Sequence, residues 1–146
     1  MQNTHIQLMS DIILSIKPEF TKLILLGKKT IELRKRVGKQ FSPGCDLYIY
    51  ASSPQKAIVG KAIISSIDYA DIDVIIKRYL TQTCVEESFI RGYYKNHRKG
   101  VLVSICNVVK FSSPLALSEL RTFGFHPPQS FCYVSEDLSP ILRNAI

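Results

Sequence analysis

The sequence of 146 residues lacks the patterns that mark zinc-binding, secreted and membrane-spanning proteins. Its four cysteines lie far apart without a CxxC pair, and no histidine falls at zinc-finger spacing from them, which argues against a structural metal. The N-terminus has neither the cationic start nor the apolar core of a signal peptide, and no apolar run approaches membrane-spanning length. We therefore expect a cytoplasmic protein with reduced thiols, no cofactor and no membrane partner.

Catalytic motifs built on histidine or glycine are also scarce. None of the three histidines, His5, His97 and His126, lies in a motif with a nucleophile or a second histidine. His97, within KNHRK, could serve a ribonuclease, but the alternative is a solvated basic loop. No glycine-rich loop that could hold a phosphate is visible.

The composition favours a single domain with an anionic partner. Hydrophobic residues make up 46% of the chain, enough for one core, and there is no internal repeat or Gly/Ser linker. We expect a loose tail over residues 1–10 and one domain over 11–146. The formal charge of +7 favours a polyanion such as nucleic acid or an anionic membrane surface.

Hydrophobic periodicity predicts a mixed β fold with helical insertions. A buried strand over 11–16 is followed by a helix that begins near Pro18 and stops at Gly27. In TIELRKR (30–36) the alternation changes to period two, so that Ile31 and Leu33 oppose a polar face. Pro43 and Gly44 make a turn, and further strands are expected over 45–52, 57–67 and 100–111. Helices are expected over 72–80 and 85–97. An extended edge segment over 127–134 and a short helix from about Ser135 should close the chain. This order predicts an α+β fold, a small mixed or antiparallel β-barrel with helices packed around it.

The stretch GKKTIELRKR (27–36) surrounds one carboxylate with cationic side chains. Gly27, Lys29, Glu32 and Arg34 fit GxKxxExR, the signature of the ASCH superfamily, which resembles PUA-type RNA-binding domains. The run ILSIKPEFTKLILLGKKTIELRKR, followed by YIYASSP, IVGKA and PPQSFCYV, is similar to bacterial and phage ASCH proteins called predicted transcriptional regulators. The similar pieces span most of residues 12–134.

This resemblance implies a small β-barrel with a cleft beside the helix-to-strand turn that carries the signature. There the family is thought to bind RNA or nucleotides, and single-stranded RNA is the expected partner. Functions differ among its members, which include RNA-binding modules, ribonucleases and a branch that hydrolyses acylated cytidine. That amidohydrolase branch has threonine where this chain has Glu32, which weakens the third possibility.

Lys29, Glu32 and Arg34 are close enough in sequence to converge on one small volume. Arginine offers a planar fork to phosphate or a purine edge, and glutamate offers an acceptor to a base or ribose, or holds the two cations together. The alternative is an ordinary exposed ion pair, worth about 0 to 1 kcal/mol. Lys29 and Glu32 are the candidate catalytic residues, although Lys29 acts as a base only if burial or Arg34 lowers its pKa, which Glu32 opposes.

Further candidates come from three other segments. Lys17 precedes Pro18 on extended backbone near the signature turn. Tyr50, Ser52 and Ser53 lie at a strand end and could point into the cleft mouth, although the serines could equally be turn residues before a proline. After a double proline, Gln129, Ser130 and Phe131 could form a preset wall with an amide, a hydroxyl and a stacking ring; core packing is the alternative for Phe131.

A second basic stretch over 91–99 carries two tyrosines. Cations with aromatic side chains suit single-stranded nucleic acid, but Tyr93 and Tyr94 could instead pack a helix against the barrel. From the sequence we expect an RNA-binding or nucleotide-binding module with a regulatory role. The alternatives are a ribonuclease, an amidohydrolase of a modified nucleoside, or a protein-interaction domain, and the oligomeric state is open.

Overall fold

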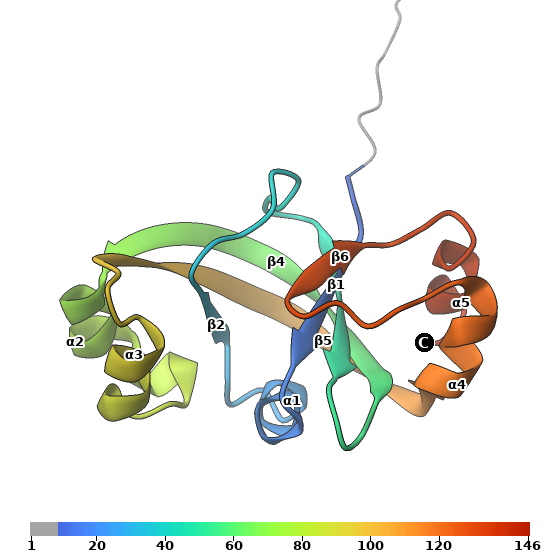
Figure 1. The fold of residues 1–146 in the computed structure, drawn as a ribbon, viewed down its shortest axis with the longest axis horizontal. Helices are drawn as coiled ribbons and strands as arrows, with labels where there is room; N and C mark the ends of the chain where they lie inside the picture. The colour runs from blue at the N-terminus through green and yellow to red at the C-terminus, as the bar shows by residue number, and fades with distance from the viewer. Residues whose placement is uncertain (1–8) are drawn as a thin grey trace, which may run out of the picture.

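A computed structural model describes residues 9–146, and Figure 1 draws its fold. The predicted tail over 1–10 falls mostly outside these residues, and His5 does so entirely. Along the chain the elements are β1 (Ile12–Ile16), α1 (Pro18–Leu25), β2 (Ile31–Arg34), β3 (Asp46–Ala51), β4 (Ala57–Asp71), α2 (Ile72–Thr83), α3 (Glu87–Tyr93), β5 (Lys99–Ala116), α4 (Leu117–Leu120), the 3-10 helix η1 (Arg121–Phe123), β6 (Phe131–Tyr133) and α5 (Ser139–Arg143).

The strands form one six-stranded sheet in the order β2-β5-β4-β3-β1-β6. β1 runs parallel to β3, and the other neighbours are antiparallel. The two longest strands, β4 and β5, pair along their length with several register shifts, which bend and twist a sheet. The sheet therefore curls into a half-barrel, visible as the arch of β4 and β5 in Figure 1. The prediction of a mixed α+β fold with a barrel-like sheet and surrounding helices is confirmed.

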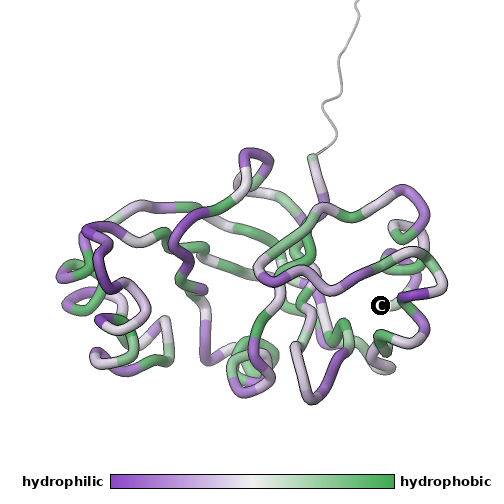
Figure 2. The backbone as a smooth tube through the Cα atoms, in the orientation of Figure 1, coloured by the Kyte–Doolittle hydropathy of each residue, from purple (hydrophilic) through white to green (hydrophobic). Residues whose placement is uncertain are grey.

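Both faces of the sheet are buried because helices cover them at different places. Along β1, Ile12 and Leu14 face the core inside the curl, whereas Ile13 faces the C-terminal helices together with Tyr48 of β3. α2 and α3 lie at one end of the molecule, α4 and α5 at the other, and α1 between them (Figure 1). Figure 2 accordingly shows hydrophobic segments along the central strands and hydrophilic residues at the outer helix turns.

The strand β2 follows the predicted alternation and ends two residues earlier than predicted. Ile31 and Leu33 pack with Ile75 of α2, which leaves Glu32 and Arg34 on the opposite face. The ladder with β5 stops at Arg34, whose carbonyl oxygen accepts a hydrogen bond from the Tyr94 hydroxyl at 2.9 Å. The backbone at this point is therefore tied to the end of α3.

Turn chemistry explains where several other elements end or begin. Gly27 after α1 has a φ of 78° and Gly44 before β3 a φ of 94°, conformations that favour glycine, as the predicted helix stop and turn require. The last helix was predicted from Ser135 but begins at Ser139, because Pro140 fits the first helical turn. The short α4 and η1 were not predicted.

Candidate functional site

A cleft of about 730 Å³ lies beside the signature strand β2. It is bounded by α1, by α3, by the turn between β3 and β4 and by the segment before β6. The predicted site residues that line it are Lys17, Lys29, Glu32, Arg34, Tyr50, Ser52, Ser53, Gln129 and Ser130. These predicted residues therefore lie around one cleft, and their binding role stays a prediction.

The three charged signature residues meet on one wall of this cleft. Glu32 Oε1 lies 3.5 Å from Lys29 Nζ, and Glu32 Oε2 lies 2.7 Å from Arg34 Nη2. Their side chains are only 2%, 11% and 12% exposed for Lys29, Glu32 and Arg34. The alternative of an ordinary exposed ion pair is therefore wrong, because solvent screens this cluster only weakly.

Arg34 joins the two edges of the curled sheet. Its Nη2 also donates to the backbone oxygen of Ser15 on β1 at 2.8 Å, and its Nη1 donates to Ser130 Oγ, just before β6, at 3.2 Å. Ser15 reinforces this junction, because its hydroxyl donates to the Pro128 oxygen at 2.7 Å. Most of the guanidinium fork is thus occupied by protein acceptors, which favours a positioning role for Arg34.

Lys29 connects the cluster to the helical end of the molecule. Its ammonium donates to the Thr83 oxygen at the end of α2 at 2.6 Å and lies 5.2 Å from the centre of the Phe20 ring. Burial lowers the pKa of Lys29, and the nearby Glu32 carboxylate opposes that shift. Lys29 therefore both lines the cleft and holds the end of α2 through this hydrogen bond.

Two predicted site residues lie outside the cleft wall. Phe131 was expected to offer a stacking ring, but it pairs with Leu14 across the β1–β6 ladder and packs edge-to-face on Phe41, with ring centres 4.9 Å apart. The core-packing alternative is correct because side chains alternate along β6, so that Ser130 and Phe131 point to different faces. Gly27 contributes the turn after α1, as expected, rather than a cleft surface.

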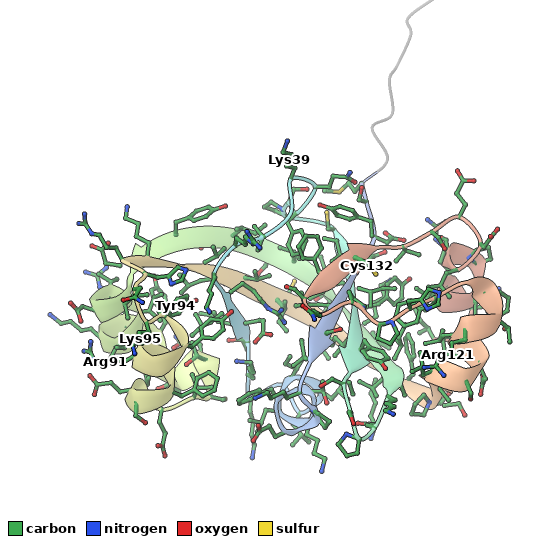
Figure 3. All side chains as sticks on the ribbon, viewed as in Figure 1. Lys39, Arg91, Tyr94, Lys95, Arg121 and Cys132 are labelled. Atoms are coloured by element: carbon green, nitrogen blue, oxygen red, sulfur yellow. The ribbon has the colours of Figure 1, made fainter. Side chains whose placement is uncertain are left out.

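The second basic stretch divides between the core and a separate surface. Tyr94 is buried against α2, which agrees with the alternative that it packs a helix against the barrel. Tyr93 lines the cleft. Arg91 points away from the cleft and pairs with Asp73 and Glu87 at 3.2 and 3.0 Å. Figure 3 shows Arg91 and Lys95 at the α2–α3 end of the molecule.

Sequence reasoning missed several cleft residues, among them the exposed cations Lys56 and Arg121 and the aromatic residues Phe20 and Phe89. Lys35 and Tyr93, which belong to the two basic stretches of the sequence, also line the cleft. Figure 3 shows Arg121 at the opposite end of the molecule from α3. No local motif joins these positions, because the fold brings them together from separate segments.

Residues 9–146 offer neither a cluster of metal ligands nor a membrane-spanning helix. Within this range no group of three or more His, Cys, Asp and Glu side chains is placed to hold a metal ion. In the same part of the chain, no helix combines the length and apolar character needed to span a bilayer. Burial raises the pKa of the phenol of Tyr50, one of the residues that line the cleft.

Comparisons with known proteins agree with this architecture. A family described as "Domain of unknown function (DUF365)" matches residues 9–124. An "ASCH domain-containing ribonuclease" from Zymomonas mobilis is 28% identical over 129 residues, which is 87% of this chain and 86% of the relative. The crystal structure of ASCH from Zymomonas mobilis superposes with a TM-score of 0.86 and 26% identity, over 94% of this chain and 96% of that one.

More distant structures share only the fold. The N-terminal domain of McrB from Staphylothermus marinus matches with a TM-score of 0.59 and 13% identity, over 90% of this chain and 92% of that one. The similarity to the Zymomonas structure shows that the half-barrel is an ASCH and PUA-like fold, as the signature implied.

Proposed function

The chain belongs to the DUF365 family and is an ASCH domain, and we propose that it binds single-stranded RNA in the cleft and cleaves it. The similarity to an ASCH domain-containing ribonuclease supports the enzyme alternative better than the regulatory binding module. The observation that carries the proposal is a cleft of about 730 Å³ in which exposed cations surround a fixed cluster of hydrogen-bonding groups. Membership of the transcriptional-regulator group stays a prediction.

RNA affinity would come from the cations that the protein does not bury. Lys17, Lys35, Lys56 and Arg121 line the cleft and are exposed, unlike Lys29 and Arg34. They can neutralise backbone phosphates and release counterions when a strand enters. The buried Lys29–Glu32–Arg34 cluster instead fixes the wall against which the strand lies.

Two hydroxyl groups on this wall suit the stabilisation of a reacting phosphate. Ser130 Oγ accepts a hydrogen bond from Arg34 Nη1, so its own proton is free to be donated into the cleft. The Tyr50 phenol carries its proton at neutral pH, and burial raises its pKa further. Such donors, fixed before the substrate arrives, can hold charge that develops on phosphate oxygens. The transfer of a proton by Lys29 or Glu32 stays a prediction.

Labelled single-stranded RNA tests both parts of the proposal. We expect shorter products on a denaturing gel, and binding that weakens steeply as salt rises. In Lys56→Ala the slope of log affinity against log salt should fall by about 0.7, the value for one phosphate contact on a single strand. Lys77→Ala is the matched control, because Lys77 is an exposed lysine of α2 outside the cleft wall.

The outcomes separate the remaining alternatives. Binding without cleavage would favour the regulatory module, and hydrolysis of acylated cytidine would favour the amidohydrolase. A salt-insensitive affinity, or equal slopes for Lys56→Ala and Lys77→Ala, would contradict the cleft as the RNA site. No binding of RNA or nucleotide at low salt would favour the protein-interaction domain.

A further inference from the structure

Three aromatic rings gather along the helical wall of the cleft. Phe89 and Tyr93 are four residues apart on α3, so they share one face of the helix. Their ring planes are nearly parallel, at 9°, with centres 6.2 Å apart. Phe20 of α1 approaches Phe89 edge-on, with ring centres 5.8 Å apart. The orientation of the Phe89 ring is therefore set from two sides.

Phe89 is not needed to hold α3 on the sheet. That contact is made by Ile90 and Tyr94, which are buried in one cluster with Ile31 and Leu33 of β2 and Leu102 of β5. Phe89 is 43% exposed, although its ring lines the cleft. An oriented aromatic ring that faces a polar cleft offers a flat apolar surface to a ligand.

The charge around the rings favours an anionic ligand. Lys35 Nζ lies 4.9 Å from the centre of the Tyr93 ring, and Lys17 lines the same cleft from the start of α1. A nucleotide combines a flat base with a phosphate, so aromatic rings flanked by lysines match both of its parts. A purely apolar ligand would leave these ammonium groups without a counter-charge.

We propose that Phe89 and Tyr93, supported by Phe20, form a stacking subsite for one unpaired base of single-stranded RNA, with its phosphate held by Lys35 and Lys17. This subsite rests on the proposed function and specifies which part of the RNA the α3 wall contacts. Every base has a π face, so stacking contributes affinity with little choice of sequence.

Fluorescence anisotropy with short labelled single-stranded RNA provides the test. Phe89→Ala should weaken binding by roughly 5- to 150-fold, the effect of losing one base stacked on an aromatic ring. Phe89→Leu should weaken it comparably, because leucine keeps apolar bulk without a flat ring, whereas Phe89→Tyr should bind like the wild type. Phe123→Ala is the control, because Phe123 of η1 is also an exposed phenylalanine, at 37%, and lies outside the cleft wall.

A set of RNAs, each lacking the base at one position, shows whether the ring contacts a base. One of these RNAs should bind the wild type more weakly than intact RNA, and Phe89→Ala should abolish that difference. Circular dichroism melting checks that each variant is folded. If the wild type binds RNA and Phe89→Ala matches Phe123→Ala, the subsite is refuted while the proposed function stands. If the wild type binds no RNA, both fail.

Discussion

Replacing Arg34 with alanine removes the side chain that spans the two edges of the curled sheet. The guanidinium donates to Glu32 on its own strand, to the Ser15 oxygen on β1 and to Ser130 Oγ before β6. After the substitution the Ser15 oxygen loses this donor, and Glu32 keeps only Lys29 as a counter-charge at 3.5 Å. We expect a loss of stability as well as weaker RNA binding.

The size of the loss follows from burial. Removing one partner of a buried ion pair costs about 3 to 5 kcal/mol, because the other charge stays in a poorly solvated place. The Arg34 side chain is 12% exposed and Glu32 retains Lys29, so the lower end, about 3 kcal/mol, is expected. For a chain of this size that lowers the melting temperature by roughly 6 to 12 °C.

Urea denaturation followed by circular dichroism measures this free energy. Arg91→Ala is the matched control, because Arg91 also contacts two carboxylates, Asp73 and Glu87, but its side chain is 53% exposed. Its unfolding midpoint should stay within experimental error of the wild type. The unfolding midpoint of Arg34→Lys should lie between those of Arg34→Ala and the wild type, because an ammonium lacks the planar fork that reaches three acceptors. Equal midpoints for Arg34→Ala and Arg91→Ala would refute the reasoning.

Two further predictions concern the core. Burial raises the pKa of Tyr48 to about 12. Between pH 10 and 12 the unfolded state therefore loses the Tyr48 proton first, and the free energy of unfolding falls as pH rises. Tyr48→Phe should flatten that fall in urea titrations, and an unchanged slope of unfolding free energy against pH would contradict the prediction. A Cβ at Gly100 would lie 2.5 Å from the Tyr94 ring, whereas one at Gly92 in α3 meets nothing within 4 Å. In denaturation curves, Gly100→Ala should therefore lower the free energy of unfolding by about 1 to 3 kcal/mol, whereas Gly92→Ala should raise it by about 0.5 to 1 kcal/mol. A Gly100→Ala variant more stable than Gly92→Ala would contradict the packing.

Local patterns predicted the signature strand well. The alternation of Ile31 and Leu33 with Glu32 and Arg34 fixes which side chains share a face, because side chains along a strand point to opposite sides in turn. Gly27 likewise marks the helix end through its own backbone preference. The charged cluster was therefore predictable from eight consecutive residues, and its burial was not.

The parts that escaped prediction depend on contacts between distant segments. Arg34 meets Ser130 across 96 positions, and Lys29 meets Thr83 across 54. Nothing near Thr83 or Phe89 in the sequence shows that α2 and α3 close one side of a cleft. Through these contacts the protein itself holds the signature cations, and other side chains line the open part of the cleft.

The segment before β6 shows how a single position can decide a functional assignment. Ser130 and Phe131 were both predicted to face the cleft, but the ladder sets Phe131 opposite Leu14, whose side chain lies in the core. Cys132 then faces the C-terminal helices, so apolar residues occupy both faces of β6 and the pattern alone does not give its orientation. The register of β6 with β1 shows which face of the sheet each side chain of β6 occupies. The aromatic surface of the cleft is therefore expected on α3, at Phe89 and Tyr93, rather than on β6.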